Sequence, residues 1–262
     1  MNQNKYLNEV WAKYVADGRS SCENFPLDRL DKSQKDAYVR FVCIADTHDD
    51  LKSVLPQIPN GDILIHAGDI TNFGEKEEIE RFNECIALLP HRHKVVIAGN
   101  HDLGFEDGED LSKREERYAN RGTQEGYRFL KGCTYLADSS VEISGIKIYG
   151  TPWHPLPGYS FSRQRGDEIA AKWNMIPSDI NVLITHTPPL GHGDVYNGFH
   201  EGCENLLNVV EERIKPQFHV FGHVHVGHGV TTNGSTIFIN CATVDPETKR
   251  YFDPIIFDVP LQ

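Results

Sequence analysis

Five short apolar runs in this chain stop at side chains of the kinds that bind metal ions. They are VCIADTH (42–48), DILIHAGD (62–69), KVVIAGNHD (94–102), VLITHTP (182–188) and HVFGHVH (219–225). Runs rich in Val and Ile are typical of strands that are buried on both faces. Because sites in open α/β sheets form at the carboxyl ends of strands, the five ends could deliver their polar side chains to one place. We therefore expect an α/β domain built around a metal site.

The polar residues at these five ends supply enough ligands for two divalent metals. They are Asp46, His48, Asp69, Asn100, His101, His186, His223 and His225. Side chains alternate along an extended segment, so we expect each of the pairs Asp46/His48 and His223/His225 to lie on one side of its segment. Gly68 and Gly99 precede Asp69 and Asn100 and allow a close backbone approach and a turn. The pattern indicates a two-metal hydrolase, in which a central carboxylate such as Asp69 could bridge the two cations.

Composition narrows the class of protein. A chain of 262 residues is long enough for one large α/β domain with a substantial core. Its net charge of −12 disfavours nucleic acid polymers, but not a small anionic substrate held by metals. Six cysteines without a CxxC spacing favour reduced, structural thiols. We find no secretory signal and no stretch of about 20 apolar residues. We expect an intracellular, cytoplasmic protein that does not bind a membrane.

Periodicity predicts the elements that surround the apolar runs. A helix is expected over 5–17, ended by Gly18, and a polar connection then leads to the first strand. We place residues 1–39 outside the domain proper, which spans 40–262. Further elements are a crossover helix at 74–89, hairpins at 141–150 and 230–240, helices at 166–174 and 203–214, and a last strand at 254–260. The charge-rich stretch 102–132 is either a solvated helix and loop or a cap over the site.

The order of the motifs, DxH, GD, GNHD, H and GHxH, resembles that of the calcineurin-like metallophosphoesterase superfamily. Other segments are similar to the metallophosphoesterase-domain-containing family: RFNECIALLP, KIYGTPW, KWNMIP, ITHTPPLG, GCENLLNVV, HVFGHVHVGHG and PIIFDVP. Together they cover nearly all of residues 40–260. The resemblance implies a two-layer β sandwich flanked by helices, and not a Rossmann sheet. It also implies phosphodiesterase activity on cyclic nucleotides, including 2′,3′-cyclic esters.

The resemblance further implies a role for each site residue. One metal would take Asp46, His48, Asp69 and His225, and the other Asp69, Asn100, His186 and His223. A hydroxide between the metals would attack phosphorus in line. His101 would protonate the leaving oxygen or stabilise charge on the phosphoryl oxygens. Imidazole, carboxylate and amide ligands suit Mn, with Fe or Zn as alternatives. Some animal members of the family carry Gly where this chain has His223, so the second site should be complete here.

Other readings stay open at this stage. One is a phosphomonoesterase, although GDITNFG lacks the Asp-Arg-Gly of the Ser/Thr phosphatases. Another is a scaffold without activity, which should have lost ligands that this chain retains. We expect His66 and His219 to be structural and His91, His93 and His200 to lie on the surface, and each of His154, His192 and His228 could touch substrate. The exact substrate, the natural metal and the oligomeric state are not readable from the sequence.

Overall fold

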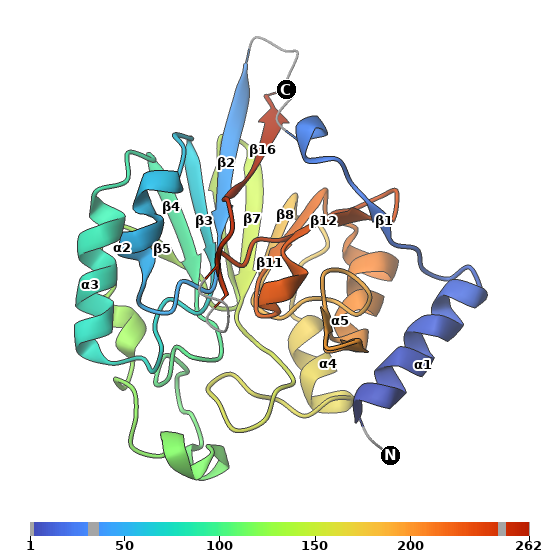
Figure 1. Ribbon diagram of the computed structural model, residues 1–262, viewed down its shortest axis with the longest axis horizontal. Helices are drawn as coiled ribbons and strands as arrows, with labels where there is room; N and C mark the ends of the chain where they lie inside the picture. Colours follow the sequence, from blue (N-terminus) through green and yellow to red (C-terminus); the bar gives the residue numbers. More distant parts are fainter. Residues whose placement is uncertain (1–2, 31–36, 246–249, 262) are drawn as a thin grey trace.

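The computed structural model describes residues 3–30, 37–245 and 250–261, and its centre is a pair of β sheets (Figure 1). The smaller sheet has five strands in the order β16-β2-β3-β4-β5. Its strands β2 to β5 run parallel, and β16 pairs antiparallel with β2. The strands span Tyr38–Ile44 (β2), Ile63–Ala67 (β3), His93–Ile97 (β4), Thr134–Tyr135 (β5) and Ile255–Pro260 (β16).

The larger sheet has seven strands in the order β1-β12-β13-β11-β8-β7-β6. Its four middle strands are parallel, whereas the predicted hairpins β6–β7 and β12–β13 are antiparallel pairs. The bounds are Glu23–Asn24 (β1), Ser139–Ile143 (β6), Ile146–Thr151 (β7), Val182–Thr185 (β8), Phe218–Phe221 (β11), Gly229–Thr232 (β12) and Ile237–Asn240 (β13). The five apolar runs thus belong to two sheets: β2, β3 and β4 to one, β8 and β11 to the other.

Helices cover the outer face of each sheet (Figure 1). They are α2 (Leu51–Val54) and α3 (Lys76–Ala87) beside the five-stranded sheet, and α4 (Asp167–Trp173) and α5 (Glu204–Val209) beside the seven-stranded sheet. A π-helical turn over Val210–Ile214 extends α5. As predicted, α3 is a crossover between the parallel strands β3 and β4. The predicted two-layer sandwich flanked by helices is confirmed.

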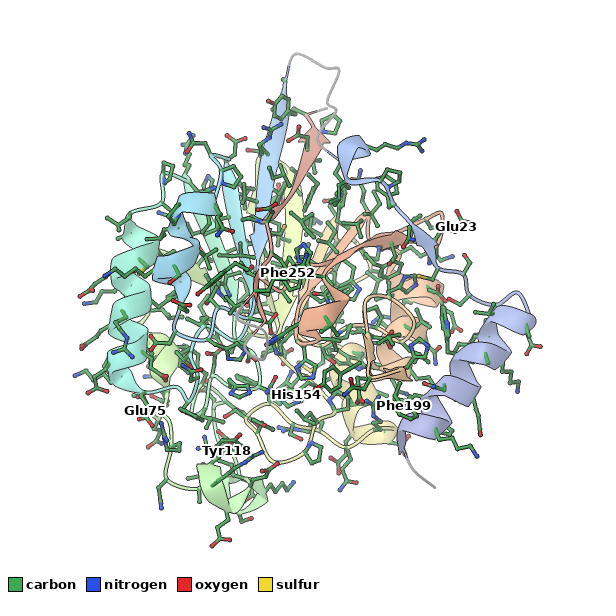
Figure 2. The ribbon with its side chains drawn as sticks, viewed as in Figure 1. Glu23, Glu75, Tyr118, His154, Phe199 and Phe252 are labelled. Carbon is green, nitrogen blue, oxygen red and sulfur yellow. The ribbon has the colours of Figure 1, made fainter. Side chains whose placement is uncertain are left out.

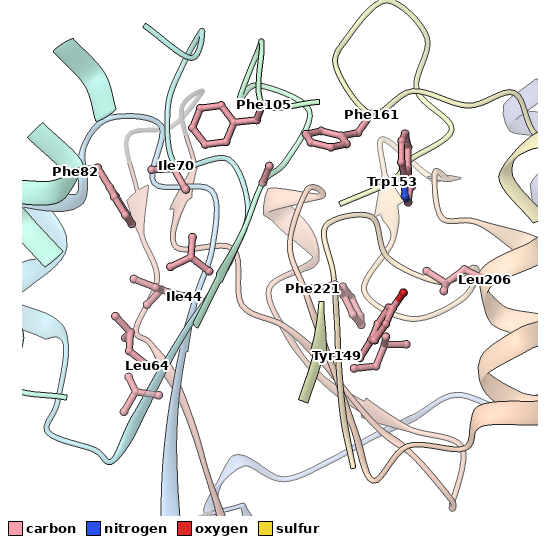
Figure 3. Packing of buried hydrophobic residues seen from close by; sticks show 14 of the residues in the cluster. Ile44, Leu64, Ile70, Phe82, Phe105, Tyr149, Trp153, Phe161, Leu206 and Phe221 are labelled. Atoms are coloured by element: carbon pink, nitrogen blue, oxygen red, sulfur yellow. The ribbon is translucent and has the colours of Figure 1, made fainter. Parts of the chain in front are cut away.

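Burial of the strands on both faces explains their nearly continuous apolar sequences. Inward-facing residues of both sheets, such as Phe41, Ile65 and Ile184, form one buried cluster. Residues on the outer faces form a second buried cluster with helix residues. It includes Leu64 of β3 with Phe82 of α3 on one side, and Tyr149 of β7 with Leu206 of α5 on the other (Figure 3). This arrangement holds the strand ends rigidly, because a close-packed interior resists displacement.

Helix α1 and several short elements complete the described chain. Helix α1 (Gln3–Ala16) ends before Gly18, whose φ is 64°. The connection that follows contributes β1, an edge strand that the sequence did not predict, and the domain boundary at residue 39 stays a prediction. Across the described residues, no helix combines the length and apolar character needed to cross a membrane. The remaining pieces are the paired strands β9 (Val195–Tyr196) and β10 (Phe199–His200), the pair β14 (Val244–Asp245) and β15 (Arg250–Tyr251), and 3₁₀ turns at Leu27–Arg29, Leu55–Gln57, Leu111–Lys113, Glu116–Tyr118, Gly126–Phe129 and His225–Gly227.

A stack of three rings ties the two sheets together and allows a test of the sandwich. The ring of Phe257 lies 4.6 Å from that of Phe41 and 4.0 Å from that of Phe218, which belongs to the other sheet. Phe257→Ala should lower the free energy of unfolding by about 3–5 kcal/mol, because it leaves a cavity between the layers. The neighbouring Ile256 is partly exposed, so Ile256→Ala should cost clearly less in urea denaturation. Equal losses would contradict this account of the core.

Candidate metal centre

The seven predicted metal ligands form a closed ring of contacts. The Nε2 atom of His225 lies 3.4 Å from Asp46 Oδ1 and 3.3 Å from His48 Nε2. Asp69 Oδ2 lies 3.6 Å from His48 Nε2 and 3.4 Å from His186 Nε2. Asn100 Oδ1 lies 2.9 Å from His186 Nε2 and 2.8 Å from His223 Nδ1. The backbone N–H of His223 donates to Asp46 over 2.9 Å and closes the ring.

The backbone brings these residues together in a different way from the one we expected. Asp46, His48, Asp69 and His223 have φ values of 55°, 43°, 53° and 70°, in the left-handed region that non-glycine residues rarely occupy. The prediction of extended segments with ligands alternating to one side is therefore wrong at both pairs. Sharp turns after the strands, and not pleat geometry, aim the side chains inward. Such strain is typical of functional sites whose surroundings hold the backbone in place.

Two glycines allow the backbone to approach the site side chains closely, as the sequence predicted. Gly68 has a φ of 96°, and a Cβ there would lie 2.6 Å from His186 Nδ1. A Cβ on Gly99 would lie 2.2 Å from Asp69 Oδ1. Both distances are far too short for real contacts, so only glycine can precede Asp69 and Asn100 at this spacing.

The buried carboxylates create a strong demand for positive charge. Burial alone would raise the pKa of Asp46 and Asp69, but neighbouring imidazoles outweigh it and lower both pKa values. Burial opposes charge on His186 as well, yet Asp69 and Asp46 raise its pKa to about 9. Burial lowers the pKa of His48 to about 4, so this imidazole is neutral and can act as a ligand. Either protons on the imidazoles or bound cations must balance the negative charge of the two carboxylates.

The orientation of the imidazole rings fits cations. His186 Nδ1 donates to the carbonyl of Ala67 over 2.9 Å, which leaves Nε2 facing the site. Such a backbone partner is the usual device that orients a metal-binding histidine. Ligands about 2.1 Å from a shared cation at right angles lie about 3 Å apart, close to the spacings in the ring. Among the described residues, three sets of Asp and His side chains have ligand atoms close enough together to hold an ion. The sets are Asp46/His48/His225, His48/Asp69/His101 and Asp46/Asp69/His186. The clusters fit divalent metal binding.

His101 stands beside the ring. Its backbone N–H donates to Asp69 Oδ1 over 2.8 Å, and its ring lies 4.9 Å from that of His48. Its Nδ1 donates to the carbonyl of Asn72 over 2.8 Å. The Nε2 atom is therefore the ring nitrogen left for chemistry, in a residue that lines the cavity.

Sequence reasoning missed Asp102, which ties two ligand-bearing turns together. One of its oxygens accepts from the N–H and hydroxyl of Thr71, at 2.9 and 2.8 Å. The other accepts from the N–H of Gly99 at 2.8 Å and of Ile70 at 3.2 Å. Burial and the charge of Asp69 raise the pKa of Asp102 to about 6. The sequence signal that could have identified this role is the final Asp of GNHD, because an acidic side chain inside a buried turn needs hydrogen-bond partners.

A cavity of about 560 Å³ opens over the ring. Its walls come from the segments 151–165 and 187–202, from the turn after β11 and from Asn72 after β3. No residue of 103–132 lines it. Instead, the hydroxyl of Tyr118 lies 3.2 Å from that of Tyr159, so the charge-rich segment supports a wall from behind and does not cap the site. Besides the site residues, the walls consist of Asn72, Leu156, Tyr159, Tyr196, Glu201, Val224 and Val226.

The remaining histidines divide into expected and unexpected cases. His66 and His219 are buried strand residues that pair with Thr47 and Thr185 at 2.9 and 2.8 Å, which confirms their structural role. His91 is only 2% exposed, so its predicted surface position is wrong. It precedes β4, and its neighbours cover it. The three histidines that could touch substrate do not line the cavity. His154, which is labelled in Figure 2, is buried with its ring 6.2 Å from that of His223. His192 stacks on Phe238, and His228 bonds to the Ala242 carbonyl.

Comparison with known sequences now places the chain in a family. The profile of the calcineurin-like phosphoesterases matches residues 39–227. The chain belongs to the calcineurin-like phosphoesterase family. Membership and the Asp and His clusters together support a general, metal-dependent phosphoesterase activity.

Individual relatives agree with this assignment. A UPF0046 protein of Caenorhabditis elegans is 56% identical over 259 residues, which cover 97% of this chain and 92% of that protein. Human metallophosphoesterase domain-containing protein 1 is 40% identical over 242 residues, covering 88% and 74%. One solved structure superimposes with a TM-score of 0.57 at 16% identity, covering 86% of this chain and 100% of the other. At that identity the likeness concerns the fold alone.

The role of Asp102 can be tested by an isosteric change. In Asp102→Asn, either orientation of the amide turns an NH₂ group towards backbone donors. We expect the free energy of unfolding to fall by about 1–3 kcal/mol and metal binding to weaken, measured by urea denaturation and metal titration. Asp107→Asn is the control, because that carboxylate is exposed and accepts a hydrogen bond from the hydroxyl of Tyr127 instead of from backbone N–H groups of the ligand-bearing turns. Identical behaviour of the two variants would refute the role.

Proposed function

We propose that this protein is a dinuclear metal-dependent phosphodiesterase that hydrolyses small phosphodiesters, cyclic nucleotides among them. The supporting observation is the lining of the cavity. Among the described residues, no Lys or Arg lines it, whereas Leu156, Tyr159, Tyr196 and Val226 do. A monoester dianion would gain from a cationic side chain beyond the metals. A diester carries one charge less and has a second organic substituent, which suits these walls.

The ring of contacts suggests how the ligands divide. Asp46, His48, Asp69 and His225 would hold one cation, and Asp69, Asn100, His186 and His223 the other. Asp69 would be the shared ligand, since its Oδ2 lies within 3.6 Å of an imidazole from each group. Two divalent cations supply charge neutralisation at the phosphoryl oxygens and activate water as a nucleophile. The mixed ligand set leads us to propose Mn, with Fe or Zn as alternatives.

The protein's own residues supply the rest of the chemistry. The Asn72 carbonyl holds His101 through Nδ1, so its Nε2 can deliver a proton to the leaving oxygen. Asp69 fixes the backbone of His101 through the N–H contact of 2.8 Å. Ligand geometry and the position of the acid are thus linked through one carboxylate.

Two alternatives are weaker. A phosphomonoesterase would use the same centre, but the cavity walls do not favour a dianion. A scaffold without activity has no reason to keep seven ligand-type side chains in one ring. We also propose that nucleic acid polymers are not substrates, because the chain carries a net charge of −12.

An assay panel tests the proposed function directly. Removal of metal should abolish hydrolysis of bis(4-nitrophenyl) phosphate, and Mn²⁺ should restore it. With Mn²⁺, kcat/KM for this diester or for a 2′,3′- or 3′,5′-cyclic nucleotide should exceed that for 4-nitrophenyl phosphate by at least about tenfold. A preference for the monoester would establish the alternative. Full activity after rigorous metal removal would rule out both.

The role of His101 gives a second prediction. His101→Ala should keep its metals while kcat falls by about 10²–10⁴-fold for substrates with alkyl leaving groups. The loss should be smaller for 4-nitrophenolate, which needs little protonation. His93→Ala is the control, since that residue begins β4 and does not line the cavity. An equal loss for both kinds of leaving group would indicate charge stabilisation instead of proton transfer.

A further inference from the structure

One wall of the cavity is carried by a short hairpin that holds no metal ligand. Its strands β9 and β10 pair through Tyr196 with Phe199 and Val195 with His200. The hairpin brings Tyr196 and the adjoining Glu201 to the cavity. At its base, Asp194 accepts from His200 Nδ1 at 2.8 Å and from the N–H of Gly202 at 3.0 Å. The base of the hairpin is therefore well fixed.

The outer end of the hairpin depends on helix α1, about 190 residues earlier in the chain. The Asn8 amide donates to the Gly198 carbonyl over 3.1 Å and accepts from the His200 N–H over 2.8 Å. The Trp11 ring lies 5.8 Å from the ring of His200. It also covers Gly191, where a Cβ would lie 2.3 Å from the ring. Figure 2 shows Phe199 of β10 on the side of the molecule that faces α1. One asparagine thus bonds to the hairpin turn and to strand β10.

Helix α1 is itself firmly anchored. Leu7 and Tyr14 are buried in a cluster with Leu190 and Leu207, and the Tyr14 hydroxyl donates to Glu204 over 2.6 Å. The helix therefore acts as a fixed support against which the hairpin rests. Because hydrogen bonds between folded segments restrict motion, loss of the Asn8 contacts should loosen the hairpin without unfolding α1.

The cavity wall to which the hairpin contributes is partly apolar. Leu156, Tyr196 and Val226 line the cavity and are 38%, 37% and 51% exposed. Exposed apolar side chains beside a polar catalytic floor are typical of a site that binds an organic group next to the reacting atom. Glu201 adds a carboxylate to the same wall.

We propose that Asn8 is a positioning residue for substrate binding. It holds the β9–β10 hairpin so that Tyr196 and Glu201 form the surface on which the second ester substituent of the phosphodiester packs. This inference rests on the proposed phosphodiesterase function, and it assigns selectivity to an element outside the metal centre. The bond that is cleaved and the acid that assists the cleavage are unchanged by Asn8.

Two diesters with the same leaving group test the inference on the metal-loaded full chain. In Asn8→Ala, KM for bis(4-nitrophenyl) phosphate should rise by about three- to tenfold, as expected for two lost hydrogen bonds. KM for methyl 4-nitrophenyl phosphate, kcat for both and metal content should stay within about twofold. Glu9→Ala is the matched control, because Glu9 neighbours Asn8 on the same helix, is exposed and forms an ion pair with Lys5.

Hydrogen exchange gives a readout that does not depend on turnover. The amides of residues 199–201 should exchange faster in Asn8→Ala than in Glu9→Ala. The positioning role would be overturned if the unaltered protein hydrolyses diesters normally and Asn8→Ala leaves KM for bis(4-nitrophenyl) phosphate unchanged. That conclusion would hold whether or not hydrogen exchange accelerates. An unaltered protein that hydrolyses no diester would overturn the proposed function, and with it the role of the hairpin in binding a second ester group.

Discussion

The burial of two carboxylates, Asp46 and Asp69, is the constraint on which the rest of the structure depends. Taking a carboxylate out of water is costly unless positive charge and hydrogen bonds replace the lost solvent. Here imidazoles from the turns that follow β2, β8 and β11 surround the pair. The imidazoles are positively charged only when they are protonated, whereas a divalent cation carries its charge independently of protonation. The centre is organised as a metal site before any question of catalysis arises.

The packed β sandwich stabilises the strained backbone around these carboxylates. Four site residues occupy left-handed backbone conformations, each of which costs free energy unless its surroundings enforce it. Backbone bonds from Asp46 to Gly68 and from His48 to Asp69, at 2.9 and 3.1 Å, connect the two turns that follow β2 and β3. Asp102 connects the turns that follow β3 and β4. The strands behind them are packed on both faces, so the strain cannot relax.

In the proposed function, different parts of the chain would carry reaction and selectivity. The strand ends would supply the metal ligands and His101, whose positions depend on the core. The walls of the cavity come from loops supported at a distance, Tyr159 by Tyr118 and the β9–β10 hairpin by α1. Changes in these supports can alter what fits without disturbing the metal centre. This division is common where loops are positioned by a rigid scaffold.

The sequence by itself determined the chemistry and the layering. The Val- and Ile-rich runs identified strands buried on both faces, and their polar ends named all seven members of the ring. Gly68 and Gly99 predicted the close approach of the backbone to neighbouring site residues that the structure shows. These features are local, because they depend on residue type and on spacing within a few residues. The resemblance to phosphoesterases supplied the two-layer arrangement, which periodicity alone could not distinguish from a single open sheet.

Only the tertiary structure decided how distant segments meet. The left-handed turns at Asp46 and His223 arise from contacts across the two sheets, so an extended reading was natural and wrong. The burial of His91, the supporting role of residues 103–132 and the bridge from Asn8 to the hairpin all depend on neighbours far along the chain. A sequence pattern indicates which side chains are available in each segment. Packing decides which of them face one another, because it fixes the relative positions of segments that lie far apart in the sequence.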